Sequence, residues 1–173
     1  MRADKSELQT AYNTLTEQVS TEGKTPASIK KYQDAKAKIQ NQINAAQNEA
    51  KQILDNSNPT VSQVNNALNN IKAVQPKLDS AIHLLENKAN NNELVTAKNQ
   101  LQAALNQPDP THGMTPQTIT NYNAKKQAAQ AELQKADQVI NNGDATAQQI
   151  ADEKSKVNQA LQAPVSYTHL TLP

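Results

Sequence analysis

The chain has 173 residues, of which 36% are hydrophobic, and it contains no Cys, Trp or Phe. Its 17 basic and 16 acidic residues are interspersed and leave a formal charge of +1, without the basic runs that bind nucleic acid. The lack of Cys excludes disulfides, Cys-ligated zinc and thiol catalysis. No apolar stretch approaches the roughly 20 residues that cross a membrane. From the charge pattern and the missing apolar stretch, we expect neither a nucleic-acid partner nor membrane insertion.

The composition favours helices. Asn and Gln together account for 42 residues, Gly for only three, and the helix-favouring residues Ala, Gln, Lys, Leu and Glu dominate the chain. Aromatic residues, which favour strands, amount to 2%. The low apolar fraction supports only a narrow core. The sequence therefore predicts an all-α protein built from small modules.

The first half of the chain contains three segments with apolar residues at helical spacings of three, four and seven. We expect helices around residues 8–19, 29–53 and 61–85. Because two such helices would leave much of their apolar stripes in water, a three-helix bundle is the economical arrangement. The apolar stripes consist of Leu8, Tyr12, Leu15, Val19, Ile29, Tyr32, Ile39, Ile43, Ala46, Ala50, Ile53, Val61, Val64, Leu68, Ile71, Leu78, Ile82 and Leu85.

The second and third of these helices have clear start signals. Thr25-Pro26 places a capping hydroxyl before a proline at the first helical position, and Thr60 with Gln63 forms a capping-box pattern. The Asn56-Ser57-Asn58-Pro59 segment between them has the composition of a turn. Pro76 lies inside the third predicted helix, where we expect it to remove one backbone hydrogen bond and kink the helix.

The second half of the chain repeats the first. Thr115-Pro116, the Thr146 and Gln149 pair and the turn Asn142-Gly143-Asp144 repeat the signals described above. The matched blocks differ in offset, which we attribute to insertions and deletions in the loops between helices. The pairs are residues 23–32 with 113–122 at an offset of 90, 5–12 with 98–105 at 93, and 60–64 with 146–150 at 86.

The repeat predicts two three-helix modules, residues 4–89 and 92–163, stacked end to end as an elongated rod. The second module takes its apolar stripes from Leu94, Leu101, Leu105, Ile119, Tyr122, Ala129, Leu133, Ala136, Ile140, Ala147, Ile150, Val157 and Leu161. Between Leu85 and Leu94 there is neither Gly nor Pro, so one continuous helix could join the modules. The alternative is a break at Asn90–Asn92, because three Asn are poor residues for a helix interior.

The last residues differ in composition from the rest. Residues 165–173 contain no Ala, Asn, Gln or charged residue and resemble the translation of a sequencing-library adapter. We therefore expect this tail to be non-native and give it no role in the fold. The alternative is a native extended segment after the last helix.

Taken together, the block Gly-x-Thr-Pro-x-x-Ile-x-x-Tyr, present at residues 23–32 and 113–122, and the Asn-rich turn followed by Thr-x-x-Gln resemble the FIVAR module. The resemblance covers roughly residues 4–163 and is strongest to the tandem repeats of giant staphylococcal surface adhesins. A shorter first loop in the second copy, around Pro108-Asp109-Pro110, departs from the first copy without threatening the fold. The resemblance implies three-helix bundles in a wall-anchored, extracellular bacterial surface protein that binds host matrix protein such as fibronectin. It brings no catalytic residue and no cofactor.

Candidate chemical groups are sparse. His83, His112 and His169 lie far apart in the sequence, so we expect solvated side chains rather than a metal site. Carboxylates have a Lys within one turn, as in Asp34 with Lys38 and Glu132 with Lys135, which indicates helix-surface ion pairs. We predict no catalytic, cofactor-binding or metal-binding residue, and the residues that bind a partner remain unknown.

Tyr32 and Tyr122 occupy equivalent positions in the two copies. Each follows an Ile of the apolar stripe by three residues and so shares its helix face. We interpret both as core rings whose hydroxyl reaches the rim, and the alternative is a platform on which a sugar or peptide stacks.

The resulting hypothesis is a non-catalytic adhesin repeat that acts as a stalk and binds matrix weakly through many copies, with neighbouring repeats of the same chain as its contacts. One alternative is a structural spacer or wall-organising element without a specific ligand. Another is an accessory module of a carbohydrate-active surface enzyme.

Overall fold

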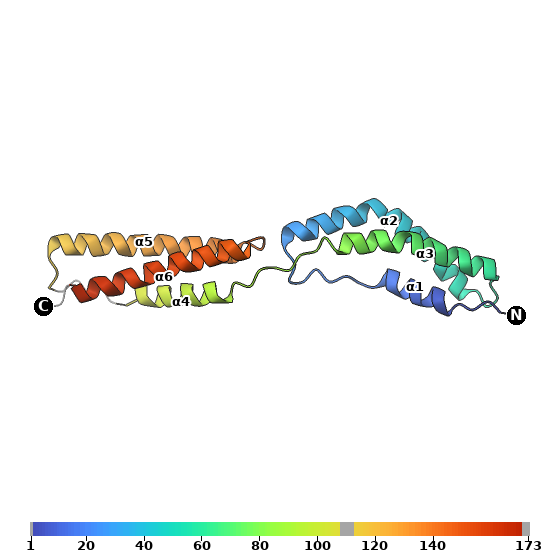
Figure 1. Ribbon diagram of the computed structural model, residues 1–173, viewed down its shortest axis with the longest axis horizontal. Helices are drawn as coiled ribbons and strands as arrows, with labels where there is room; N and C mark the ends of the chain where they lie inside the picture. Colours follow the sequence, from blue (N-terminus) through green and yellow to red (C-terminus); the bar gives the residue numbers. More distant parts are fainter. Residues whose placement is uncertain (1, 108–112, 171–173) are drawn as a thin grey trace. The chain divides into compact units, whose positions relative to one another are not determined.

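The computed structural model describes residues 2–107 and 113–170, and from residue 163 onward the backbone alone. Its described residues form six α-helices and no strand, apart from one isolated bridge between Lys24 and Asn87. The chain divides into two compact units, Met1–Asn87 and Lys88–Pro173, which we call the first and second module (Figure 1). The protein is all-α, as the composition predicts.

The first module contains α1 (Ser6–Thr16), α2 (Pro26–Asp55) and α3 (Val61–Ile82), and each helix packs against the other two. With 30 residues, α2 is the longest, about 45 Å at 1.5 Å per residue. Helix α1 has only 11 residues, and the chain continues from it along the bundle without helical structure until α2 begins (Figure 1). The third side of this bundle is therefore helical over only part of its length.

The core of the first module is a narrow stripe drawn from all three helices. Its largest fully buried side chains are Leu8, Ile43, Ile71 and Val74. Ala at several core positions lets the helices approach closely. The buried cluster comprises Leu8, Leu15, Ile43, Ala46, Ala50, Val64, Ala67, Leu68, Ile71, Val74 and Leu78.

The second module contains α4 (Asn92–Leu105), α5 (Pro116–Asn141) and α6 (Ala147–Leu170), which also contact one another pairwise. Its core has the same character, with Leu94, Leu101 and Val157 fully buried. The buried cluster comprises Leu94, Ala97, Leu101, Ala129, Leu133, Ala136, Ala145, Ile150 and Val157. Two three-helix bundles, each with its own core, follow one another along the chain.

The start signals read from the sequence are confirmed. The side chain of Thr25 accepts a hydrogen bond from the Ser28 N–H, and that of Thr115 accepts one from the Thr118 N–H, each before a helix that starts with Pro. Thr60 forms a reciprocal capping box with Gln63 at the start of α3. The second module repeats this box, with distances of 2.9 and 3.1 Å.

The alignment of the first helices by an offset of 93 is wrong. Lys5, which precedes α1, donates hydrogen bonds from Nζ to the carbonyl oxygens of Leu54 and Asn56 at the end of α2. Asn91, which precedes α4, donates in the same way to the Ile140 carbonyl oxygen at the end of α5. These matched contacts set the offset at 86, one heptad less. A shift of seven residues returns to the same helix face, so the apolar spacing does not reveal the error.

The length differences between the copies also lie elsewhere than predicted. Helix α2 has 30 residues and α5 has 26, whereas α1 has 11 and α4 has 14. The helices themselves therefore change length, and the loops do not absorb the whole difference. A change of four residues is close to one turn, which keeps the apolar stripe facing the core.

The continuous helix considered between Leu85 and Leu94 is absent. Helix α3 ends at Ile82, residues 83–91 are not helical, and α4 begins at Asn92. The break is also wider than the alternative at Asn90–Asn92. Val19, which the spacing predicts on the first helix, likewise lies beyond the end of α1.

The cause of the early end of α3 is a set of hydrogen bonds within the first module. The Thr25 N–H donates to the Glu86 carbonyl oxygen at 2.8 Å, and the Glu86 N–H donates to the Ser28 hydroxyl oxygen at 3.0 Å. Lys24 Nζ donates to Asn87 Oδ1 at 2.7 Å. These contacts, which we term the exit clamp, satisfy backbone groups at the start of α2 and require an extended backbone at residues 86–87.

Pro76 lies inside α3, and the helix continues through it. The predicted loop difference at 108–110 and His112 lie outside the described residues. In the predicted non-native tail, residues 165–173, the structure describes only the backbone, and only up to Leu170, where α6 ends. The side chains of the tail, including that of His169, therefore lie outside the described residues.

Candidate functional site

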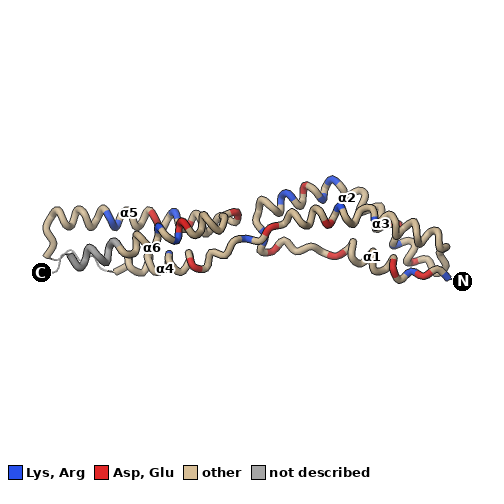
Figure 2. Tube along the Cα trace, viewed as in Figure 1, with Lys and Arg blue, Asp and Glu red and all other residues tan. Residues whose placement is uncertain are grey.

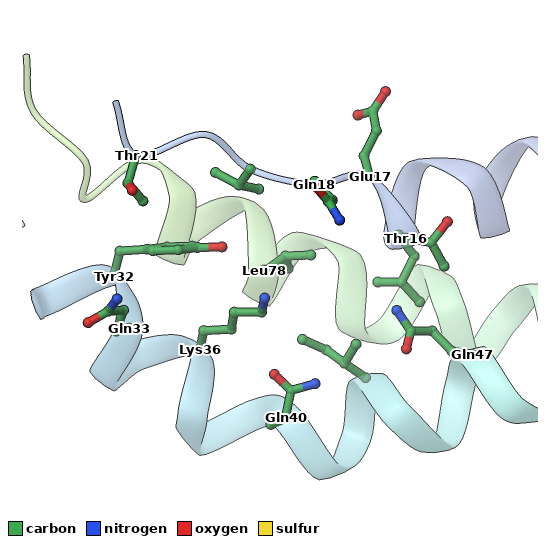
Figure 3. A pocket seen from close by; sticks show the side chains of 13 residues that line it. Thr16, Glu17, Gln18, Thr21, Tyr32, Gln33, Lys36, Gln40, Gln47 and Leu78 are labelled. Atoms are coloured by element: carbon green, nitrogen blue, oxygen red, sulfur yellow. The ribbon is translucent and has the colours of Figure 1, made fainter. Parts of the chain in front are cut away.

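The first module contains a groove beside the non-helical segment that follows α1. Its volume is about 420 Å³, and it is bounded by residues 16–21, α2 and α3 (Figure 3). The groove exists because α1 ends at Thr16 while α2 and α3 run on. Side chains of the non-helical segment cover this stretch less completely than another helix would. Its lining residues are Leu15, Thr16, Glu17, Gln18, Val19, Thr21, Tyr32, Gln33, Lys36, Gln40, Ile43, Gln47 and Leu78.

The groove has an apolar floor and an amide-rich rim. Leu15, Ile43 and Leu78 are buried members of the core that reach its base. Several Gln side chains, from α2 and from the segment after α1, surround it (Figure 3). Amides offer both donors and acceptors, so the rim can hydrogen-bond a polar chain or a peptide backbone. It carries no array of general acids, bases or nucleophiles: Glu17 and Lys36 are the ionisable groups besides Tyr32 in the lining.

The interpretation of Tyr32 and Tyr122 as core rings is confirmed. Tyr32 is 5% exposed and Tyr122 is 7% exposed. Lys36 Nζ lies 6.0 Å from the centre of the Tyr32 ring, at the outer limit of a cation–π contact. A ring this deeply buried leaves too little surface for a ligand to stack on.

Several of the exposed charges form isolated pairs. Lys30 pairs with Asp34 at 3.0 Å, so the predicted pairing of Asp34 with Lys38 is wrong. Between helices, Lys72 pairs with Glu7 and Lys154 pairs with Glu93, and the hydrogen bond from Lys154 lowers the pKa of Glu93. In Figure 2, basic and acidic residues are interspersed along both modules. Exposed pairs of this kind contribute about 0–1 kcal/mol each.

One pair of acidic groups lies inside the second module. Glu153 on α6 is 6% exposed, and Glu132 on α5 is half-buried and interacts with it. Among the described residues, no ion pair joins Glu132 to Lys135, so the predicted surface pair is wrong. Burial, followed by the hydrogen bond to Glu132 and the charge of Glu132, raises the pKa of Glu153 to about 7, although Lys156 and Lys135 act in the opposite direction. Sequence reasoning missed this carboxyl pair. Its signal was spacing, since Glu153 follows buried Ile150 by three residues and precedes buried Val157 by four.

No metal-binding arrangement occurs in the part of the chain that the structure describes: it contains no group of three or more His, Cys, Asp or Glu side chains placed to hold an ion. His83 follows the end of α3 as its C-cap residue. None of the described helices combines the length and apolarity that spanning a bilayer requires.

The fold defines a class of protein, namely tandem three-helix modules in which a short first helix precedes two longer, Thr-capped helices around a narrow core that contains several alanines. A model of the FIVAR domain matches residues 11–79 and 97–163, and the chain belongs to the FIVAR family. The matches start 86 residues apart, the same offset that the Lys5 and Asn91 contacts set for the first helices.

Relatives share these repeats over most of this chain. The extracellular matrix-binding proteins EbhB of Staphylococcus aureus strain N315 and ebh of strain NCTC 8325 are each 52% identical over 94% of this chain. A solved structure from the characterization of extracellular matrix binding protein (Embp)-mediated Staphylococcus epidermidis adherence to fibronectin is 42% identical, with a TM-score of 0.57. It aligns over 95% of this chain and 98% of its own.

The chain spans only 4% of the length of EbhB and 2% of ebh. The names of these relatives describe binding to extracellular matrix and no enzymatic activity. The predicted family and the all-helical fold are confirmed.

Proposed function

We propose that this chain is a non-catalytic repeat segment of a bacterial cell-surface adhesin that binds host extracellular matrix, with fibronectin as the ligand. The observation that carries the proposal is the likeness to the Embp structure, which covers 98% of that chain at 42% identity. The matrix-binding names of the Staphylococcus aureus relatives support the same ligand class. The chemistry of the described surface supports a non-catalytic role, since amides and interspersed charges of both signs dominate it.

The mechanism that we propose is avidity. Each module presents the same kind of neutral, amide-rich surface, so one module binds weakly and many modules on one chain bind together. Linked weak sites gain about 100- to 10,000-fold in apparent affinity without any new contact. Modules repeated along one chain that is anchored to the cell wall would present many copies of this surface outside the cell. In the first module, the groove beside Tyr32 offers a peptide segment an apolar floor and an amide-rich rim.

The test compares arrays of different length on immobilised fibronectin. The two-module chain and an array of four or more modules are passed over the surface. The variant Lys36→Glu, which reverses the charge of a residue that lines the groove, tests the groove. We expect weak binding by the two-module chain, much slower dissociation of the longer array, and weaker binding by Lys36→Glu. If neither length binds at tens of micromolar, the adhesin proposal fails.

A structural spacer is the second candidate function. It is favoured by the lack of exposed apolar groups: among the described residues, only Val61 and Leu84 are large hydrophobics with high exposure. A neutral polar surface suits a stalk that must not aggregate. The binding experiment separates the two functions, because a spacer gives no response to fibronectin at any array length.

A further inference from the structure

The carboxyl pair Glu132–Glu153 has no counterpart in the first module. The C-caps of α2 and α5, Asn56 and Asn142, are 86 residues apart, and so are the capping-box residues Thr60 and Thr146. At this offset, Glu132 corresponds to Ala46 and Glu153 corresponds to Ala67. Both alanines belong to the buried cluster of the first module and are 3% and 0% exposed. One copy therefore holds two carboxyl groups where the other holds two methyl groups.

The geometry makes full ionisation of the pair unfavourable. Glu132 Oε1 and Glu153 Oε2 are both buried and have no hydrogen-bond partner. Glu153 lies within hydrogen-bonding reach of Glu132. Two carboxylates in this arrangement repel each other, and burial penalises negative charge, whereas a single shared proton lets one group donate to the other. In carboxyl dyads of this kind, the two groups do not both carry a negative charge.

The charged groups around the pair do not neutralise it. Lys135 on α5 and Lys156 on α6 favour ionised Glu153, but both are exposed, and their effect is smaller than that of burial and of Glu132. The charged residues of α4 are engaged elsewhere, because Glu93 pairs with Lys154 and Lys98 pairs with Asp137. A bound proton, rather than a neighbouring Lys, therefore neutralises the buried charge of the folded pair.

We propose that the carboxyl pair makes the second module a pH-responsive element, which holds a proton and is most stable in mildly acidic surroundings and loosens as the pH rises through neutrality. The first module, with Ala46 and Ala67 at these positions, lacks the device. Because the two modules share one chain, acidification stiffens one repeat and leaves its neighbour unchanged. The proposal concerns stability and does not depend on which ligand the repeats bind.

The sign follows from linkage. The pKa of Glu153 is about 7 when folded, against an ordinary value of 4.5. The folded state binds the proton more tightly, so the stability that protonation contributes is fully present below about pH 4.5 and is lost as the pH rises through about 7. Between pH 5 and 8, the ratio of folded to unfolded second module should fall on the order of 10- to 100-fold.

Hydrogen exchange of the intact chain, read by mass spectrometry of peptides, measures both modules at once. After correction for the intrinsic pH dependence of exchange, we expect protection in α5 and α6 to fall 10- to 100-fold between pH 5 and 8, as estimated above. Protection in α2 and α3 should stay within about threefold. This comparison places the control in the same molecule.

Two variants complete the test. Glu153→Gln keeps a side chain that can hydrogen-bond to Glu132 and removes the shared proton, so the fall in protection should disappear. The double variant Glu132→Ala with Glu153→Ala recreates the alanine pair of the first module and should also be independent of pH, which decides the matter if Glu153→Gln folds poorly. Equal pH profiles in both modules of the wild-type chain, or a fall that persists in the double variant, would overturn the proposal.

Discussion

Gly23 and Gly113 have the same backbone conformation just before the second helix of each module. Their φ angles are +74° and +82°, in the left-handed region that side chains with a Cβ disfavour. In both copies, the sequence Gly-x-Thr-Pro therefore has a physical explanation. Gly allows the reversal, Thr caps the helix, and Pro starts it.

Substitution of Gly23 should cost stability through backbone strain alone. An added Cβ at Gly23 meets no atom within 4 Å, so no clash contributes. We expect Gly23→Ala to destabilise the first module by about 1–2 kcal/mol, and Gly23→Asn by less, because Asn tolerates this conformation better. Urea unfolding of the chain measures both, and equal effects of Ala and Asn would contradict this explanation.

Ser28 supports the exit clamp from a buried position, with 3% of its surface exposed. It accepts the Glu86 N–H and donates to the Thr25 carbonyl oxygen at 2.9 Å. We expect Ser28→Ala to cost about 1–2 kcal/mol, since it leaves a backbone donor without its partner. Exchange of the Glu86 amide should accelerate, whereas Ser28→Thr, which copies Thr118 of the second module, should retain most of its protection.

At the scale of helices, the sequence predicts where elements begin better than where they end. Starts have chemical signals, as at Thr25, Thr60, Thr115 and Thr146, and all four form the expected caps. Ends depend on tertiary contacts. Helix α3 stops at Ile82 because Glu86 hydrogen-bonds to the start of α2. Its partner Ser28 lies 58 positions earlier in the sequence.

The candidate sites were unpredictable for related reasons. The groove depends on the path of the segment after Thr16. Periodicity cannot trace this path, because Val19 continues the apolar spacing beyond the end of α1. The carboxyl pair was visible only as two Glu spaced among apolar residues on two different helices. A Lys one turn away from Glu132 offered a simpler but incorrect reading, since local pairs are common on helix surfaces.

Pro76 provides a test of helix energetics within α3. Its side chain is exposed, and its ring removes the donor that would bond to the Lys72 carbonyl oxygen. A proline in a helix interior costs about 3 kcal/mol relative to Ala, and relaxation of the surrounding helix recovers part of this. We therefore expect Pro76→Ala to stabilise the first module by about 1–3 kcal/mol in urea unfolding. No gain, or a loss, would mean that the core depends on the geometry that Pro76 imposes.

At the scale of the whole chain, each of the two modules has its own hydrophobic core. The buried cluster of the first contains only residues up to Leu78, and that of the second starts at Leu94. In repeat proteins, stability is approximately a sum over units and the interfaces between neighbours. This organisation explains why a period of 86 residues can carry different core chemistry in each copy, alanines in one and carboxyl groups in the other.

Independent cores predict independent unfolding. Ile71 is 1% exposed and Leu101 is 0% exposed, so each truncation to Ala should remove about 2–5 kcal/mol from its own module through lost burial and a residual cavity. Residues without shared partners have additive effects within about 0.5 kcal/mol, so the other module should keep its stability. Segment-resolved hydrogen exchange of Ile71→Ala, Leu101→Ala and the double variant checks this. If Ile71→Ala lowered protection in α4, α5 and α6 as much as in α2 and α3, the chain would unfold as a single unit, and the first module could no longer serve as an in-chain reference for the carboxyl pair.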